Sequence, residues 1–483
     1  MLKKTQKLYE YVAQEILDRI HQGVYNSGER LPGVRRLREQ FGVSLSTVLE
    51  ACRLLEDRRI IEAYPRSGFF VRAGVSRNPE EPEISDPPTE PISVTGKSLA
   101  LRLIHAGNNP DFVQLGAAAP DPTFLPVRAL SRALGDIARK QCVQVLGNEC
   151  PPGNSDLRRQ ISRRMAELGC SVSPEQVVIT NGAHGSLTLA LRAVLDPGDI
   201  VAIESPTFYG LLQAIESTGM RAIEIPTHPK EGMSLEALQL AIEQWPVKAC
   251  VVVPNFSNPL GFLMSNEKKK ALVSLLSHHN IPLIEDDVYG DLHFGFHRPS
   301  VAKALDTSEN VLYCSSFSKT LSPGLRTGWI IPGRFQEKVE HLKFVLNLSA
   351  PTVSQLSIAR LLERGYEGHI RRVRRAYSIS VARMTQSIGE LFPVGTKVTK
   401  PEGGFVLWVE FPKEVDAVLL SQKAYMEGIS IVPGELFSAT QKYNHHIRLN
   451  CAVPWGDRVE WALRRIGELV DSLISPRSLG NKS

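Results

Sequence analysis

The sequence has few cysteines and no arrangement of them that would bind zinc or build a disulfide framework. Its 483 residues include seven scattered cysteines and no Cys-x-x-Cys pair. No run approaches the roughly 18 apolar residues that span a bilayer, and the initial Met-Leu-Lys-Lys is followed by polar residues rather than by the apolar core of a signal peptide. These absences favour a soluble protein of the reducing cytoplasm, with no metal site and no membrane partner.

The chain is too long for one compact core, so two or three domains are expected. Its formal charge of +5 is unevenly spread, because residues 1–77 hold 14 Lys or Arg against nine Asp or Glu and the remainder therefore sums to zero. A basic excess confined to one small segment favours contact with a phosphate backbone, although a solvated basic face without a partner explains the charge equally well.

A proline-rich acidic stretch separates this basic segment from the rest. Residues 78–98 contain five acids, five prolines and one base, with no helical or strand period. Such a composition predicts an extended, solvated linker, long enough to place the first domain on a partner subunit. We therefore divide the chain into residues 1–77, a linker over residues 78–105 and a large unit over residues 106–475.

Short apolar segments alternate with helical-length segments in the large unit. The segments rich in β-branched residues are 177–180, 200–203, 222–225, 249–253, 282–285 and 311–314. This alternation predicts a largely parallel sheet buried on both faces, whose ligands collect at the carboxyl ends of the strands. A long basic helix and short strands from about residue 360 predict a smaller α+β domain over about 360–475, beside a large domain over about 120–350.

Residues 30–71 show the pattern of a winged helix-turn-helix. The apolar positions of two short amphipathic helices are Leu37, Phe41, Val48, Cys52 and Leu55. A Gly42-Val43-Ser44 turn separates them and offers Ser44 as N-cap of the second helix. A hairpin over residues 60–71 follows, with Arg66 at its tip. This arrangement would present Arg35, Thr47 and Arg66 to DNA.

These residues resemble the GntR-type winged helix in the order Arg30-Leu31-Pro32, Arg35, Gly42-Val43-Ser44, Thr47-Val48 and Gly68. The resemblance implies binding of double-stranded DNA, with contacts from Arg30, Arg35, Ser44, Thr47 and Arg66. Gly33 and Leu45 depart from the family, which often has serine and arginine there, so a donor at the start of the recognition helix is lost. A winged helix used only for protein contacts is the alternative.

A lysine after an apolar strand suggests a covalently held cofactor. Lys319 ends the sequence Ser316-Phe317-Ser318-Lys319, and Arg326 follows seven positions later. A loop lysine is ordinarily a solvated charge, but Ser316, Ser318 and Arg326 are all able to bind phosphate. A lysine that forms a Schiff base needs an aldehyde cofactor anchored by its phosphate, and this pattern favours one.

The other needs of a phosphorylated pyridine aldehyde are met elsewhere along the chain. The candidates are Asp286 for the ring nitrogen, Asn258 and Tyr289 for the phenolate oxygen, Phe208 for stacking on the ring, the backbone amides of residues 180–184 for the phosphate, and Arg448 for a substrate carboxylate. Singly, each has a plainer explanation: an aspartate after a strand is often a cap, and His184 could be an ordinary loop histidine. Their order along the chain favours one shared site.

Together these motifs resemble class I/II aminotransferases of PLP fold type I, over roughly residues 110–470. The resemblance implies pyridoxal 5′-phosphate as cofactor, with the Schiff base on Lys319. It also implies phosphate contacts from Ala183, His184, Ser316, Ser318 and Arg326. One position departs: the tyrosine that the family usually lends from the neighbouring subunit is Asn148 here, which affects phosphate anchoring across a dimer.

A winged helix fused to such a domain resembles the MocR subfamily of GntR regulators. The resemblance implies a multidomain homodimer with a winged helix-turn-helix, an α/β transferase domain and a smaller α+β C-terminal domain. It also implies transcriptional regulation through pyridoxal 5′-phosphate or its aldimine with an amino-acid or amine effector. The alternatives are a working aminotransferase with a secondary N-terminal domain, or a scaffolding protein with a vestigial pocket.

Overall fold

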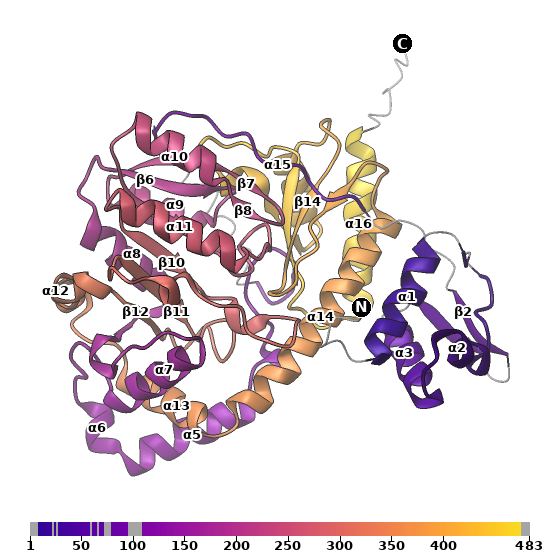
Figure 1. Ribbon diagram of the computed structural model, residues 1–483, viewed down its shortest axis with the longest axis horizontal. Helices are drawn as coiled ribbons and strands as arrows, with labels where there is room; N and C mark the ends of the chain where they lie inside the picture. Colours follow the sequence, from indigo (N-terminus) through magenta and orange to yellow (C-terminus); the bar gives the residue numbers. More distant parts are fainter. Residues whose placement is uncertain are drawn as a thin grey trace.

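The computed structural model of the chain describes residues 8–21, 24–25, 28–57, 60–64, 67–71, 79–94 and 109–474. Three bodies are visible in it: a small N-terminal unit, a large α/β domain and a smaller C-terminal domain (Figure 1). Among the described residues, no helix combines the length and the apolar character needed to cross a bilayer.

The N-terminal unit consists of three helices and a two-stranded wing. Its elements are α1 (Leu8–His21), α2 (Val34–Phe41), α3 (Leu45–Asp57), β1 (Ile61–Tyr64) and β2 (Gly68–Val71). The apolar faces of the helices and the inner side of the wing form one core. Gly42 ends α2 in a left-handed conformation with φ of 62°, which glycine adopts without steric cost and which turns the chain towards α3. Ser44 accepts a hydrogen bond from the Thr47 amide at 3.1 Å, as an N-cap does.

The large domain is built on a nine-stranded mixed sheet with the order β3-β7-β6-β9-β10-β11-β12-β5, and with β8 paired to β7. Its strands are β3 (Ile92–Ser93), β5 (Val178–Thr180), β6 (Ile200–Ser205), β7 (Arg221–His228), β8 (Gly232–Met233), β9 (Val247–Val252), β10 (Leu283–Asp286), β11 (Val311–Ser316) and β12 (Gly328–Ile331). The pairs from β7 through β11 are parallel, as the alternation of strands and helices predicts. β12 is antiparallel to both β11 and β5, and the sequence pattern did not indicate this strand.

Helices cover both faces of this sheet, so its central strands β6, β10, β11 and β12 are buried along their whole length (Figure 1). The helices of this domain are α5 (Val127–Lys140), α6 (Cys142–Leu146), α7 (Ser155–Glu167), α8 (Gly182–Val194), α9 (Tyr209–Ser217), α10 (Leu235–Gln244), α11 (Asn266–His278), α12 (Gln336–Asn347) and α13 (Thr352–Glu363). Residues of β5, β6, β10, β11 and β12 pack with α8, α9 and α12 on one face, while α10, α11, α7 and α13 lie over the other.

The smaller domain is an α+β unit, as expected. Its sheet has the order β13-β14-β17-β16. Its elements are α14 (Tyr366–Leu391), β13 (Lys397–Val398), β14 (Val406–Glu410), α15 (Ala417–Met426), β15 (Ile429–Ser430), β16 (Val432–Pro433), the short helix η6 (Gly434–Phe437), β17 (His446–Asn450) and α16 (Asp457–Ile474). The early strand β4 (Val113–Gln114) pairs with β15, so the start of the transferase part reaches the smaller domain.

The acidic, proline-rich segment differs from its expectation. Residues 79–94 are extended, as their prolines predict, but several of their side chains are buried rather than solvated. Pro82, Pro87, Pro91 and Val94 are all buried, and Ile92–Ser93 pairs with β7 as strand β3. The described part of this segment is therefore docked on the protein surface.

Candidate functional site

The sequence-predicted cofactor residues come from the carboxyl ends of β6, β9, β10 and β11 and the loops that follow them, and from the start of α8. Lys319 lies in the turn after β11, where its Nζ donates a hydrogen bond of 2.6 Å to the Ala118 carbonyl oxygen. Burial and then the Arg448 guanidinium lower the pKa of Lys319 to about 8, although the nearby Asp286 carboxylate opposes the shift. A lysine of this pKa is partly neutral, and therefore nucleophilic, near pH 8.

Asp286 is the last residue of β10, and only 7% of its surface is exposed. Its Oδ1 is buried and has no hydrogen-bond partner in the described part of the chain. Burial, and then the charge of Asp287, raise the pKa of Asp286 to about 7, while Lys319 pulls it down. A buried carboxylate oxygen without a partner suits a cationic ligand atom such as a protonated pyridine nitrogen.

Three further candidates form one hydrogen-bonded group. Arg448, in β17, is fully buried and donates through Nη1 to Asn258 Oδ1 at 3.1 Å. Asn258 donates through Nδ2 to the Tyr289 hydroxyl at 3.3 Å. The second Arg448 nitrogen donates to the Gly116 carbonyl, whereas its buried Nε has no partner in the described residues. Arg448, expected at the substrate carboxylate, is thus hydrogen-bonded to Asn258, which together with Tyr289 is expected at the ring oxygen.

The candidate phosphate site is formed where α8 begins. Arg326 donates through Nη2 to the Asn181 carbonyl at 3.2 Å and therefore lies over the first turn of α8. A Cβ on Gly182 would come within 2.5 Å of that nitrogen, and φ of Gly182 is +81°, so only glycine fits there. Ser316 and Ser318 are buried beside Lys319, and Ser318 Oγ has no partner among the described atoms. Ala183 and His184 supply the first amides of α8, a helix end that attracts anions.

Phe208 lies just after the carboxyl end of β6 and precedes α9. Its ring is half-buried, and a Cβ on Gly210 would meet it at 2.4 Å, so glycine is required beside it. Tyr209 lies next to this ring, at 4.9 Å between centroids. The Phe208 ring therefore packs against the first turn of α9, at Tyr209 and Gly210.

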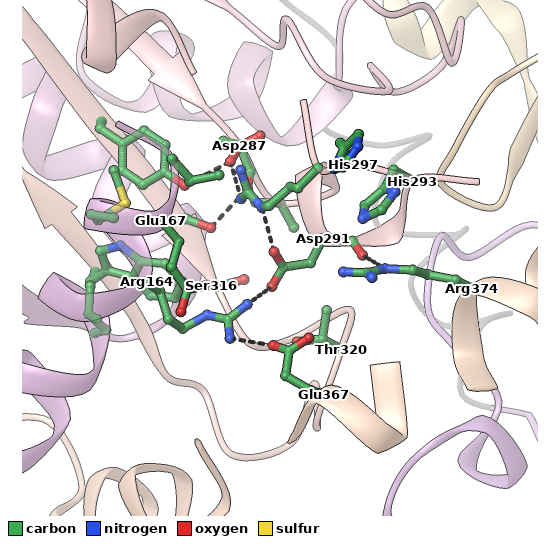
Figure 2. A pocket seen from close by; sticks show the side chains of 18 of the residues that line it. Arg164, Glu167, Asp287, Asp291, His293, His297, Ser316, Thr320, Glu367 and Arg374 are labelled. Carbon is green, nitrogen blue, oxygen red and sulfur yellow. Dashed lines mark hydrogen bonds and ion pairs between the residues drawn. The ribbon is translucent and has the colours of Figure 1, made fainter. Parts of the chain in front are cut away.

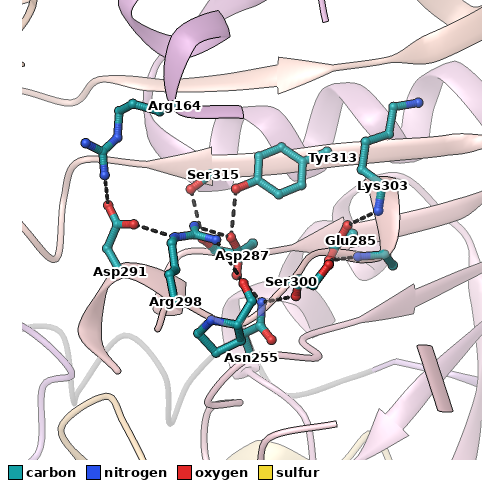
Figure 3. A network of polar contacts seen from close by, with 12 residues as sticks. Arg164, Asn255, Glu285, Asp287, Asp291, Arg298, Ser300, Lys303, Tyr313 and Ser315 are labelled. Atoms are coloured by element: carbon teal, nitrogen blue, oxygen red, sulfur yellow. Dashed lines mark hydrogen bonds and ion pairs between the residues drawn. The ribbon is translucent and has the colours of Figure 1, made fainter. Parts of the chain in front are cut away.

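The strand that carries Asp286 is fixed from its other face. Asp287 is buried and accepts hydrogen bonds from Asn255 at 2.8 Å, Tyr313 at 2.7 Å and Arg298 at 2.6 Å (Figure 3). Neighbouring residues on a strand point to opposite faces, so these contacts lie away from Asp286. The sequence pattern did not indicate this network, because no local motif links residues so far apart.

The same network continues into a cavity of about 310 Å³ between α7 and the start of α14 (Figure 2). Arg298 and Arg164 both reach Asp291, at 2.5 Å and 2.9 Å. Burial alone would raise the pKa of Asp291, but these two guanidinium groups hold it well below its usual range. The cavity is therefore lined by charges that already neutralise one another, and its walls support the end of β10.

Sequence reasoning missed the backbone groups that position Lys319 and Arg448. Both side chains donate to carbonyls of the short segment after β4, at Ala118 and Gly116. A Cβ on Gly116 would meet Ser430 Oγ at 2.6 Å, so this segment packs closely against the smaller domain. The run of small residues before Pro120 was the only sequence signal, since carbonyl groups leave no motif.

The candidate DNA-binding residues lie on the N-terminal unit as expected where the structure describes them. Arg35 and Ser44 are exposed, and Thr47 is half-exposed. The Arg30 side chain lies against the wing, because a Cβ on Gly68 would be 3.5 Å from its Nε. Arg66 lies outside the described residues. The departure at Leu45 places a 40% exposed apolar residue at the start of α3.

The comparisons with known proteins match both parts of the chain. Residues 8–71 match the family of bacterial regulatory proteins, gntR family, and residues 115–466 match aminotransferase class I and II. The HTH-type transcriptional regulator YjiR of Escherichia coli (strain K12) is 41% identical over 96% of this chain and 98% of its own length. A second regulator of that organism, YdcR, is 39% identical over 97% and 100%.

The chain belongs to the MocR-type subfamily of gntR regulators. Solved structures agree on the fold of the second part. A kynurenine aminotransferase from Pyrococcus horikoshii, crystallised with PMP, has a TM-score of 0.73 and 30% identity, and the match covers 79% of this chain and 96% of that one. The predicted fold, a winged helix-turn-helix joined to a fold type I transferase domain, is therefore confirmed.

The departure at Asn148 in this MocR-type chain lies in a surface segment of the large domain. Asn148 is exposed and follows α6, whose Val143 and Leu146 are 89% and 82% exposed. Thr352, at the start of α13, donates to the Gly147 carbonyl at 3.1 Å and so holds this segment on the protein. An exposed position of this kind is compatible with contact to a second subunit.

Proposed function

We propose that this protein is a homodimeric transcription regulator that binds double-stranded DNA through residues 1–77 and pyridoxal 5′-phosphate through residues 106–475. Its signal would be the cofactor itself or the cofactor joined to an amino-acid or amine effector. One observation carries the proposal: a winged helix shares its chain with a buried site to which Lys319, Asp286 and Arg326 contribute an amine, a carboxylate whose Oδ1 has no partner in the described residues, and a guanidinium able to bind phosphate.

The chemistry of the pocket residues fits this cofactor. The buried Asp286 oxygen and Ser318 hydroxyl both lack partners in the described residues, and each matches a group that the cofactor carries, a ring nitrogen and a phosphate. Gly182 leaves room that a side chain would fill. When bound, pyridoxal phosphate supplies an aldehyde carbon and a ring able to accept electrons.

The chain's own residues have distinct tasks in this proposal. Lys319 would hold the aldehyde carbon covalently, and Asp286 would pair with the ring nitrogen. Asn258 and Tyr289 would donate to the ring oxygen, Phe208 would stack on the ring, and Arg448 would bind an effector carboxylate. Ala183, His184, Ser316, Ser318 and Arg326 would bind the phosphate.

DNA binding by the N-terminal unit is supported by its shape and charge. α3 begins with a capped turn and carries exposed polar side chains, as a recognition helix does. Arg35 is exposed on α2, and the unit holds the whole basic excess of the chain. Long-range attraction to phosphate would add to base contacts.

A homodimer is supported by apolar side chains that are exposed on α6 and on α12. Val143 and Leu146 on α6, with Phe344 and Val345 on α12, are all more than half exposed. A subunit interface would remove such apolar surface from water. Static light scattering with absorbance at the cofactor band tests this, since a monomer fully occupied by pyridoxal phosphate would contradict the proposal.

A working aminotransferase is the second candidate, because the carboxylate of an amino-acid substrate would use Arg448 as an effector would. This arginine is buried, fixed by Asn258 and Gly116, and keeps Nε free among the described residues, so that this nitrogen is able to donate to a carboxylate. The aromatic-amino-acid aminotransferase 1 of Thermococcus litoralis is 30% identical over 74% of this chain and 88% of its own length.

One pair of assays decides between the two candidates. Each of the 20 amino acids is mixed with cofactor-loaded protein. Without an acceptor, the single conversion to pyridoxamine phosphate is followed by absorbance; with a 2-oxo acid as acceptor of the amino group, turnover is followed by formation of the new 2-oxo acid. Binding of a duplex from upstream of the protein's own gene is followed by fluorescence anisotropy. The regulator proposal expects salt-sensitive DNA binding, with or without slow conversion. Rapid multiple turnover with no DNA binding at low salt would favour the enzyme instead.

A further inference from the structure

Residues 79–94, here called the strap, connect the winged helix to the transferase part and touch both of its domains. In Figure 1 they cross one end of the molecule as a violet segment that contains no helix. At the smaller domain, the Val398 amide donates to the Glu80 carbonyl at 2.8 Å, and Lys397 lies 3.5 Å from Glu83. A motion between the two domains would therefore change the contacts of the strap.

The strap is also fixed to the large domain, near both of its ends. Glu81 pairs with Lys230 at 2.5 Å, and the Pro91 carbonyl accepts from Arg221 at 2.7 Å. Trp245 donates its indole N–H to the Thr89 carbonyl at 3.1 Å, and β3 adds two residues to the edge of the sheet beside β7. The strap thus bridges the domains with backbone and charge contacts, and does not merely join two ends of the chain.

The middle of the strap is linked by hydrogen bonds to the end of β6, which precedes Phe208. The Thr227 amide donates to Ser85 Oγ at 2.7 Å, and Thr227 Oγ1 in turn accepts from the Ser205 amide at 3.1 Å. Ser205 Oγ shares a hydrogen bond of 2.8 Å with the Tyr443 hydroxyl, from the loop before β17. Three residues after Ser205 comes Phe208, the candidate stacking residue.

A second route reaches the same place from the smaller domain. The Thr207 amide donates to the Phe437 carbonyl at 2.8 Å, and the Phe437 ring lies 5.3 Å from the Arg448 guanidinium carbon. Lys442, in the loop that follows η6, donates to the Asp86 carbonyl of the strap. Phe208, which would touch the cofactor ring, and Arg448, which would bind the effector carboxylate, are thus each linked to the strap through a short series of contacting residues.

We propose that the strap is the coupling element of this regulator: its docking on β7 and β13 responds to occupancy of the cofactor pocket and sets the position of the winged helix. The inference rests on the proposed function. A ring stacked on Phe208 orders the segment from Ser205 to Phe208, which favours the Ser205–Thr227–Ser85 contacts and therefore the docked strap. Docked and undocked straps are the two states that such coupling requires.

The test compares four proteins. Glu81→Lys with Ser85→Ala removes the charge contact to Lys230 and the hydrogen bond to the Thr227 amide; both are changed together because one exposed ion pair contributes little alone. Glu81→Lys with Lys230→Glu keeps Ser85 and restores the ion pair in reverse, and is therefore the rescue of the charge reversal at residue 81. Glu90→Lys makes the same charge change at an exposed strap residue and is the matched control. Wild type completes the set.

Two measurements are made with and without pyridoxal 5′-phosphate. Hydrogen exchange follows the Thr227 and Val398 amides, whose acceptors both belong to the strap. Fluorescence anisotropy gives the affinity for the duplex from upstream of the gene. In wild type, the rescue and Glu90→Lys, cofactor should slow exchange at both amides and change DNA affinity by roughly 5–150-fold. Glu81→Lys/Ser85→Ala should bind both ligands, exchange fast and lose that change.

The outcomes separate the two proposals. If Glu81→Lys/Ser85→Ala keeps the wild-type change in DNA affinity while its two amides exchange fast, the strap is not the coupling element. The same holds if wild type binds both ligands and neither exchange nor affinity responds to the cofactor. If wild type fails to bind the duplex or the cofactor, the proposed function itself falls.

Discussion

The two functional regions of this protein place their side chains in opposite environments. In the N-terminal unit, Arg35 and Ser44 are exposed on a small core, and they would act through summed charge and short-range contacts to a ligand outside the protein. In the transferase part, Arg448 and Asp286 are both buried; Arg448 is held by fixed hydrogen-bond partners, whereas Asp286 Oδ1 has none among the described residues. Exposed groups act additively and respond to salt, whereas buried groups act through their individual geometry and their pKa values.

The largest expected effect is at the buried end. Lys319→Ala should abolish covalent attachment of pyridoxal phosphate, because no other amine is expected to reach the aldehyde carbon. Borohydride reduction followed by peptide mass spectrometry measures it. Lys343→Met is the matched control: Lys343 is also buried, and burial lowers its pKa to about 8, so attachment should persist there. Cofactor found on a different lysine in wild type would refute the assignment.

At the exposed end, replacing Arg35 and Arg66 with alanine should remove specific DNA binding and leave cofactor binding intact. The salt dependence should also weaken, since each lost phosphate contact lowers the slope of log affinity against log salt by about 0.9. Anisotropy titrations from low to moderate salt give both quantities. Arg132→Ala with Arg192→Ala makes the same charge change on exposed residues of α5 and α8 and should have little effect. Equal losses in both double variants would mean that only net charge matters.

A smaller effect is expected for Asp286→Asn. The pKa of Asp286, about 7, lies above its ordinary value, so ionising this group destabilises the cofactor-free fold as pH rises from about 4 to 7. Asparagine removes that penalty, and the cofactor-free variant should melt no lower than wild type at pH 7.5. Its affinity for the cofactor should fall by about 1–3 kcal/mol, because a charged hydrogen bond is lost. Calorimetry and absorbance titration check this, and unchanged affinity would remove Asp286 from the site.

The smallest effect concerns pH. The pKa of Lys319 is lowered to about 8, and only the neutral amine attacks an aldehyde, so the rate of cofactor loading should rise with pH and level off above about 8. In Asp286→Asn the midpoint should fall, because the carboxylate that raises the lysine pKa is gone. Stopped-flow absorbance from pH 6 to 11 follows it. A midpoint near 10, the ordinary range for lysine, would show that Lys319 is solvated.

The sequence predicted the fold well where local pattern decides it. Alternating apolar segments indicated the parallel strands, and Gly42 with Ser44 indicated the turn and cap before α3. It failed at β12, because an antiparallel strand inserted between two distant ones has no local signature. The prediction that residues 79–94 are solvated was also wrong, because this strap is docked on the protein. Ser85 accepts a hydrogen bond from the Thr227 amide, 142 positions away, and a proline-rich acidic composition gives no sign of such a partner.

The central claim is that one chain couples the pocket around Lys319 to the DNA-binding face around Arg35. The most direct measurement is an anisotropy titration of wild-type protein with the duplex from upstream of its own gene, at one salt concentration, with and without saturating pyridoxal 5′-phosphate. The account predicts that the dissociation constant changes by roughly 5–150-fold, a coupling of about 1–3 kcal/mol. Equal dissociation constants, in protein shown by absorbance to be loaded with cofactor, would contradict it.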